Sequence, residues 1–211
     1  MKQRKRTELV FLLDRSGSMQ GLEGDTIGGY NAMLAKQKET EGEVYVTTVL
    51  FDDQYELLHD QVPLQKVAPM TEKDYFVRGC TALLDALGAT IQRISAAREP
   101  ADQVIFVITT DGLENASREY SYRKVKALVE QKKADGWEFL FFGANIDAIT
   151  AAGSVGIGPD RAVNYCPDGA GTRLNYQVAG EAVSQLRAGR PMGASWKEAV
   201  ERDFLGRKPR R

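Results

Sequence analysis

Two kinds of hydrophobic pattern alternate along the chain. Residues 9–13 and 104–108 are short, continuously apolar runs, and 44–51 is rich in β-branched and aromatic residues. Short apolar runs are typical of strands that are covered on both faces of a sheet, and β-branched residues favour strands. We therefore expect buried strands at these three segments and a fourth one at 137–142.

Between the strands, apolar residues recur every three or four positions, which indicates helices with one buried face. Gly28 and Gly29 weaken the first of them, because glycine disfavours a helix interior. A glycine at position 136 suits a left-handed helix end. The expected helices are near 25–38, 81–97, 122–135, 147–152 and 174–186.

The remaining segments complete the expected sheet. Residues 55–62 partly alternate after a turn at 52–54, which predicts an antiparallel edge strand, and 161–165 is a weak strand. Alternation of strands and helices predicts an α/β fold: an open, doubly wound, mostly parallel (Rossmann-like) sheet with one antiparallel edge strand and helices on both faces. Such sheets bind ligands at the carboxyl ends of their strands.

The composition suits one domain with short additions. The chain has 211 residues, of which 43% are hydrophobic and 27% charged, and its formal net charge is −1. We expect a basic N-terminal tail at 1–6, one domain at 7–188, and a C-terminal segment at 189–211 that ends in a basic tail. Because the net charge is near zero, we do not expect nucleic acid as a partner, and its binding through the basic ends is the weaker alternative.

The C-terminal segment carries a helix signal of its own. Ser195 and Glu198 have capping-box spacing, and Trp196, Val200 and Phe204 fall on one side of the helix that they would begin. We expect this short amphipathic helix to pack back on the domain. In the alternative, it offers its aromatic side chains to a partner.

The sequence predicts a cytoplasmic protein that has no contact with a membrane. We find no secretory signal and no run of about 18 apolar residues, which a membrane helix needs. The two cysteines, Cys80 and Cys166, lie far apart and lack the spacing of metal ligands. We therefore expect free thiols in a reducing compartment.

Oxygen-bearing side chains follow two of the predicted strands and begin one predicted helix. Asp14, Ser16 and Ser18 come directly after the first strand, Asp111 follows the strand at 104–108, and Thr81 opens a helix. Oxygen ligands with few carboxylates and several hydroxyls suit Mg²⁺ or Mn²⁺ better than Zn²⁺ or copper. The sequence therefore predicts a site for a hard divalent cation at the carboxyl edge of the sheet.

These residues resemble the metal-ion-dependent adhesion site (MIDAS) of the von Willebrand factor A (VWA) domain, and the chain looks most like its small stand-alone bacterial members. The resemblance covers about residues 7–185 and rests on the D-x-S-x-S motif at 14–18, Thr81 and the T-D-G turn at 110–112. It implies that the two serines and the threonine touch the ion, that the two aspartates act largely through water, and that an acidic residue of a partner completes the shell. In the structural alternative, Asp14 and Ser16 only cap a turn and Asp111 begins one, which does not explain why all three loops lie at one edge.

The resemblance implies a non-catalytic, divalent-metal-dependent module that binds a protein partner through an Asp or Glu side chain. The alternative is a metal-dependent hydrolase or phosphoryl-transfer enzyme on the same sheet. Such an enzyme needs a nucleophile or a general base, and the motif offers no obvious one. His59 is the only histidine, and nothing in the sequence places it near the serines.

Several other residues near the motifs have two interpretations. Cys80 stands where many members of the similar family carry glycine, and we interpret it as a small residue in a tight turn rather than a ligand. Asp85 either orients the ligands by hydrogen bonding or is an acid favoured in the first turn of a helix. Asp52 and Asp53 are interpreted as turn residues. An auxiliary metal site is a weaker hypothesis for Glu23, Asp25 and Glu114.

Overall fold

The computed structural model describes residues 6–97 and 103–207, which form a six-stranded sheet with the strand order β3-β2-β1-β4-β5-β6. Every neighbouring pair is parallel except β2 and β3, which are antiparallel. The predicted mostly parallel sheet with one antiparallel edge strand is therefore confirmed. The strands are β1 (Thr7–Asp14), β2 (Val44–Phe51), β3 (Tyr55–Pro63), β4 (Gln103–Thr110), β5 (Glu138–Gly143) and β6 (Ala162–Asn164).

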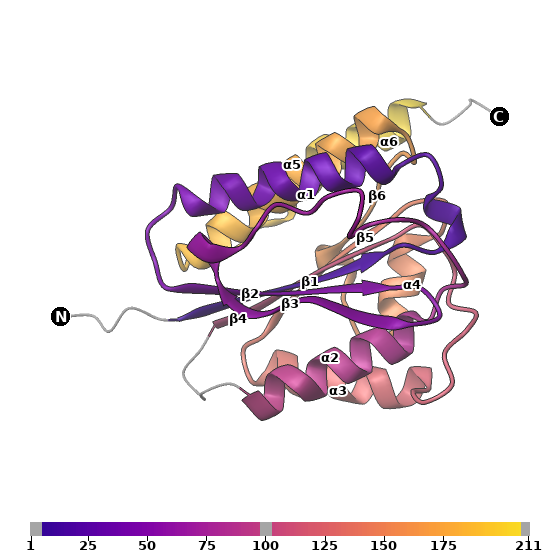
Figure 1. The fold of residues 1–211 in the computed structure, drawn as a ribbon, viewed down its shortest axis with the longest axis horizontal. Helices are drawn as coiled ribbons and strands as arrows, with labels where there is room; N and C mark the ends of the chain where they lie inside the picture. Colours follow the sequence, from indigo (N-terminus) through magenta and orange to yellow (C-terminus); the bar gives the residue numbers. More distant parts are fainter. Residues whose placement is uncertain (1–5, 98–102, 208–211) are drawn as a thin grey trace.

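Helices cover both faces of the sheet, as predicted. In Figure 1, α1, α5 and α6 lie on one side of the strands and α2 and α3 on the other. The buried residues of α4 belong to the same core cluster as those of α2 and α3. The helices are α1 (Glu23–Lys38), α2 (Leu83–Ala97), α3 (Tyr122–Ala134), α4 (Ala148–Ser154), α5 (Gly169–Arg187) and α6 (Glu198–Arg207).

The apolar run in β1 serves two hydrophobic cores. Leu9, Phe11 and Leu13 belong to the core under α1 and α5, whereas Val10 and Leu12 belong to the core under α2 and α3. All five side chains are fully buried. Because successive side chains of a strand point to opposite faces, a central strand covered on both sides must be apolar at every position.

The connections make the ends of β1 and β4 the switch point of the sheet. From β1 the chain passes through α1 to β2 and then β3 on one side, and afterwards through α2 to β4 on the other side of β1. Loops that leave in opposite directions open a crevice at this point, where ligands bind in open α/β sheets. Asp14 and Thr110 are the last residues of the two strands.

The C-terminal segment packs back on the domain, as the sequence predicts. The Val200 side chain is buried in the core under α5, and the Trp196 ring meets Phe142 edge-on with 5.6 Å between ring centroids. The Trp196 indole nitrogen donates to the Asp160 carbonyl at 2.8 Å. Residues 1–5 and 208–211 of the predicted basic tails lie outside the described residues.

The predicted capping box of the last helix is wrong. A 3₁₀ turn at Ala194–Lys197 comes first, so α6 begins at Glu198 and Ser195 does not cap it. The Lys197 side chain explains the extra turn, because its ammonium group donates to the carbonyls of Pro159 and Ala162 at 2.7 and 2.9 Å. These tertiary bonds fix the backbone before the helix starts.

Within 6–97 and 103–207, no helix is both long and apolar enough to span a membrane. Cys80 and Cys166 carry free thiols, the first exposed and the second buried.

Gly29 allows α1 and α5 to pack closely, and its neighbour Gly28 provides a matched control. A Cβ at Gly29 would lie 2.4 Å from Cδ2 of Tyr176, whereas a Cβ at Gly28 would meet nothing within 4 Å. We expect Gly29→Ala to lower the free energy of unfolding by about 1–3 kcal/mol through overpacking. Gly28→Ala should raise it by about 0.5–1 kcal/mol through helix propensity. Urea unfolding measures both, and a stabilised Gly29→Ala variant would contradict this packing.

Candidate metal centre

The first loop of the site folds back on its own strand. Asp14 ends β1, and its Oδ1 accepts a hydrogen bond from the backbone N–H of Ser16 at 2.7 Å. A single 3₁₀ turn at Gly17–Met19 follows, which sets Ser16 and Ser18 side by side. An aspartate that binds the backbone two residues ahead is a common way to reverse a chain.

The structure brings all five predicted residues together. The Oγ atoms of Ser16 and Ser18 are 3.0 Å apart, and Thr81 Oγ1 donates to Ser16 Oγ at 3.1 Å. Ser18 Oγ donates to Asp111 Oδ1 at 2.5 Å. Asp14 joins the group through the Ser16 backbone and is otherwise buried behind it. The side chains of three separate loops thus meet at the carboxyl ends of β1 and β4.

The loop after β4 also fixes Thr81. Asn115 Oδ1 accepts from the Thr81 backbone N–H at 2.9 Å, and Glu114 Oε2 accepts from the N–H of Leu84 at the same distance. The Asp85 N–H is bound by the Ser117 hydroxyl at 3.0 Å. These side chains satisfy the free N–H groups at the start of α2. The loop that supplies Asp111 therefore also holds the helix that supplies Thr81.

Asp85 binds this loop rather than the five predicted residues. It lies in the first turn of α2, and its carboxylate accepts the backbone N–H groups of Arg118, Glu119 and Tyr120 at 2.8–2.9 Å. Of the two interpretations, the first-turn position is correct. The hydrogen bonds to the loop were not predicted, and they position the T-D-G turn only indirectly.

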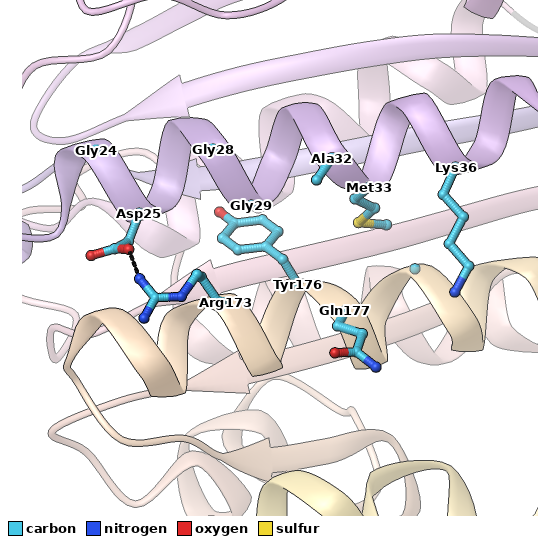
Figure 2. Close-up of a pocket in the computed structure, with 11 residues that line it drawn as sticks. Gly24, Asp25, Gly28, Gly29, Ala32, Met33, Lys36, Arg173, Tyr176 and Gln177 are labelled. Carbon is cyan, nitrogen blue, oxygen red and sulfur yellow. Dashed lines mark hydrogen bonds and ion pairs between the residues drawn. The ribbon is translucent and has the colours of Figure 1, made fainter.

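The carboxylates of the auxiliary-site hypothesis are engaged elsewhere. Asp25 pairs with Arg173 at 2.5 Å. The pair lies at one end of a groove between α1 and α5 (Figure 2), whose volume is about 430 Å³. Glu23 accepts from the Gly21 N–H at 2.7 Å, and Glu114 caps α2. Among the described residues, no three His, Cys, Asp or Glu side chains group closely enough to hold a metal ion. A metal centre built from the five predicted residues would therefore use their hydroxyls as well as their carboxylates.

Both aspartates of the site are buried, and burial changes their acidity. Burial raises the pKa of Asp14 to about 6, although hydrogen bonds, chiefly from the Thr110 hydroxyl, oppose the shift. Burial also raises the pKa of Asp111, against hydrogen bonds from Ser18 and Asn145. A nearby cation would favour the charged form of both groups. A cation bound here would therefore lower the pKa of both groups.

The spacing of the oxygens fits a small octahedral cation. Adjacent ligands in an octahedral shell with bonds of about 2.1 Å lie about 3.0 Å apart, and the Ser16–Ser18 and Thr81–Ser16 distances are 3.0 and 3.1 Å. Gly112 borders this space: a Cβ there would lie 2.6 Å from Thr81 Oγ1 and 3.1 Å from Ser18 Oγ. Donor chemistry and spacing both fit Mg²⁺ or Mn²⁺.

Two further residues hold Asp14 and were not predicted. Thr110 Oγ1 donates to Asp14 Oδ2 at 2.5 Å, and the Tyr75 hydroxyl donates to the Asp14 carbonyl at the same distance. Thr110 could have been suspected, because it precedes Asp111 directly at the end of β4. Tyr75 lies in a long loop and carries no local signal.

A buried ion cluster lies under the first loop, and it corrects the interpretation of Asp52 as a turn residue only. Arg15 is fully buried, and its Nε lies 2.9 Å from Asp52 Oδ2. Arg78 Nε binds the same oxygen at 2.7 Å, and Glu56 pairs with Arg15 at 2.7 Å. Asp52 does form the predicted turn, since its Oδ1 accepts from the Gln54 N–H at 2.6 Å. The cluster ties the loop after β1 to the β2–β3 turn and to the loop before α2.

His59 has a structural environment away from the serines. It pairs with Thr48 in the β2–β3 ladder and is half-buried, and its Nδ1 lies 3.3 Å from the Tyr30 hydroxyl. The hydroxyls of Ser16 and Ser18 bind each other and their neighbours instead. No Ser-His-Asp arrangement exists in the part of the chain that the structure describes.

Solved structures of other proteins share this fold. The vWF domain of the type V pili tip protein Mfa5 from Porphyromonas gingivalis superposes with a TM-score of 0.66 at 12% identity, over 90% of this chain and 98% of that one. The PilB minor pilin from Streptococcus sanguinis gives 0.63 at 12%, over 88% and 63%. Proximal thread matrix protein 1 from the mussel byssus, with a zinc-occupied MIDAS motif, gives 0.56 at 14%, over 84% and 46%.

At these identities the similarity shows the fold alone. The chain spans less than two thirds of the pilin and about half of the byssus protein. None of the curated proteins matches the chain.

The family comparison covers the site itself. The family described as "VWA domain containing CoxE-like protein" matches residues 1–134, which run from the start of the chain to the end of α3. The matched part includes Asp14, Ser16, Ser18, Thr81 and Asp111. More than half of the chain is thus matched, and the predicted resemblance to VWA domains is confirmed. The chain belongs to the family of VWA domain containing CoxE-like proteins.

Proposed function

We propose that this VWA domain is a non-catalytic protein-binding module that captures an Asp or Glu side chain of a partner through a divalent cation. The cluster of the Ser16, Ser18 and Thr81 hydroxyls beside two buried aspartates carries the proposal. Neutral hydroxyls leave most of a cation's charge uncompensated. A carboxylate from outside is therefore a favourable last ligand.

The resemblance to other VWA domains assigns a role to each residue. Ser16, Ser18 and Thr81 would hold the cation directly, and Asp14 and Asp111 would act through water. The zinc in the MIDAS motif of the byssus protein supports a divalent cation. For this chain we propose Mg²⁺ or Mn²⁺, because all five side chains present hard oxygen atoms.

The exposure of the site supports capture from solvent. Gly17 and Ser18 are exposed, whereas Asp14, Ser16 and Asp111 are buried. The protein thus surrounds the site on one side and leaves the other side open. A partner approaches from the side of Ser18.

The enzymatic alternative has less support. VWA domains are generally non-catalytic, and a hydrolase would need a general base that reaches its substrate. Asp14 has a raised pKa, but the Ser16 N–H and the Thr110 hydroxyl occupy its two oxygens and the side chain is buried. We therefore propose no reaction at this site.

Affinity capture tests the proposed function directly. The immobilised protein is incubated with an extract of the cells that produce it, in Mg²⁺, and is then washed with EDTA. We expect partners that EDTA releases from the wild-type protein and that Asp14→Ala does not retain. Partners that stay bound in EDTA and bind equally to the variant would refute the proposal. Binding that ignores EDTA but falls steeply with salt would indicate nucleic acid at the basic ends.

Gly112→Ala should block the metal centre without disturbing the fold. The new methyl group would lie among the hydroxyls, 2.6 Å from Thr81 Oγ1. We expect Mn²⁺ affinity, measured by calorimetric titration, to fall at least tenfold, about 1.4 kcal/mol. Gly24→Ala is the control, because its Cβ would meet nothing within 4 Å. Equal Mn²⁺ affinities of the two variants would argue against a cation at this position.

A further inference from the structure

An apolar pocket adjoins the metal centre on the side of the T-D-G turn. Its volume is about 220 Å³, several times the share of about 30 Å³ that a water molecule takes in the liquid. Gly112 lines this pocket and also borders the metal centre, where its Cβ would contact Thr81. The two sites therefore share one wall. The apolar lining includes Leu83, Leu113, Tyr122, Ile146, Ala151 and Val155.

Two large apolar side chains at the pocket are left in water. The residue Leu113, next to the T-D-G turn, is 67% exposed, and Tyr122 at the start of α3 is 46% exposed. Single exposed apolar residues are normal on a protein surface, but exposed apolar groups around a pocket mark an interaction site. Leu205 on α6 is equally exposed at 66% and does not line the pocket. It provides a matched control.

The negative charges around the pocket disfavour the binding of a second acidic side chain of the partner there. Glu114 and Asp147 line it, and both carboxylates already accept backbone N–H groups, from Leu84 and Thr150 among others. The described residues that line the pocket include no lysine or arginine. A carboxylate would be repelled there and left without a partner, whereas an apolar side chain would bury its surface.

We infer that this pocket takes a large apolar side chain from the same partner segment that places its carboxylate at the metal centre. The inference rests on the proposed function and specifies the partner further. An extended chain advances about 3.3 Å per residue, and the two sites are adjacent. The partner segment therefore carries its aliphatic or aromatic residue within about three positions of the acid.

A peptide library on phage identifies the preferred sequence. The full chain is immobilised and panned in Mg²⁺ against random twelve-residue peptides, and bound phage are eluted with EDTA. We expect the eluted peptides to share an Asp or Glu with Leu, Ile, Met, Phe, Tyr or Trp within three positions. A synthetic copy of one eluted peptide should bind about tenfold more tightly than its version with Ser at the apolar position.

Variants of the protein connect this preference to the pocket. Leu113→Ser should weaken binding of the apolar peptide about tenfold and leave binding of its Ser version unchanged, as a double-mutant cycle requires. Leu205→Ser should change the binding of neither peptide. Because Leu113 is mostly exposed, the variant should fold, which circular dichroism checks, and it should titrate Mn²⁺ like the wild-type protein.

The outcomes separate this inference from the proposed function. Peptides that share an acid without an apolar neighbour, together with unchanged binding to Leu113→Ser, would overturn the pocket while metal-dependent capture stands. If EDTA elutes no peptide, the proposed function fails and the inference fails with it. Enrichment of the acid and apolar pair with loss of affinity in Leu113→Ser supports both.

Discussion

Asp14→Asn is expected to stabilise the metal-free protein at pH 7 and to remove its response to Mg²⁺. Burial raises the pKa of Asp14 from its ordinary 3.8 to about 6, so at pH 7 the folded protein holds a charge that it disfavours. One pKa unit corresponds to about 1.36 kcal/mol, so the replacement should add up to about 3 kcal/mol to the free energy of unfolding. Asn keeps the shape of the side chain and removes the charge.

The pH dependence of the stability gained in Asp14→Asn follows from the direction of the Asp14 pKa shift. The folded wild-type protein binds the Asp14 proton more tightly than the unfolded chain does. The destabilising contribution of the Asp14 charge to the wild-type protein should therefore decrease as pH falls from about 6 towards about 4, and the advantage of Asp14→Asn should shrink over the same range. Urea unfolding in EDTA at pH 7 and pH 4.5 measures both free energies.

Mg²⁺ should remove most of the stability difference between the two proteins. A ligand at one hundred times its Kd stabilises the folded state by about 2.7 kcal/mol, and Asp14→Asn should gain almost nothing at the same concentration. Asp135→Asn removes an exposed acid at the end of α3 and should stay within about 0.5 kcal/mol of wild type in EDTA. An Asp14→Asn variant that is less stable in EDTA at pH 7, or that Mg²⁺ stabilises as it does wild type, would contradict the assignment.

Asp52→Ala is expected to destabilise the protein by about 3–5 kcal/mol, because it leaves the guanidinium group of Arg15 buried without its one buried carboxylate partner. Arg15 Nε lies 2.9 Å from Asp52 Oδ2, and both side chains are fully buried. The loss should appear in urea unfolding as a lower midpoint with an unchanged slope.

Glu56→Ala is the matched control for the buried ion cluster. Its carboxylate also contacts Arg15, at 2.7 Å, but its side chain is 47% exposed, so its removal should cost less than about 1 kcal/mol. A double replacement, Arg15→Met with Asp52→Leu, should recover most of the stability lost in Asp52→Ala. Equal losses in Asp52→Ala and Glu56→Ala would show that burial does not govern this cluster.

The sheet could be predicted because its pattern is local. The apolar run at 9–13 identifies β1. Pairing with β2 extends this strand to Thr7 at one end and to Asp14 at the other. The helix at 23–38 forms despite Gly28 and Gly29, because Gly29 packs against the Tyr176 ring of α5. That contact joins residues far apart in the sequence, which no local propensity can show.

The same contrast between local motifs and contacts over long sequence distances applies to the residues of the metal centre. D-x-S-x-S and the T-D-G turn are short motifs at strand ends, so the sequence alone could indicate Asp14 and Asp111. The Asp85 hydrogen bonds to residues 118–120 and the Arg15–Asp52 pair depend on how distant loops meet. The apolar pocket likewise combines residues of separate loops and helices.

Anomalous diffraction from crystals of this protein grown with Mn²⁺ tests most directly whether the five side chains form one cation site. We expect a single strong peak bonded to the Oγ atoms of Ser16 and Ser18, at about 2.1–2.2 Å, with at least one ligand that does not come from the chain. Full occupancy of Mn²⁺ elsewhere, with no peak among these hydroxyls at millimolar Mn²⁺, would show that the cluster is only a hydrogen-bonded turn.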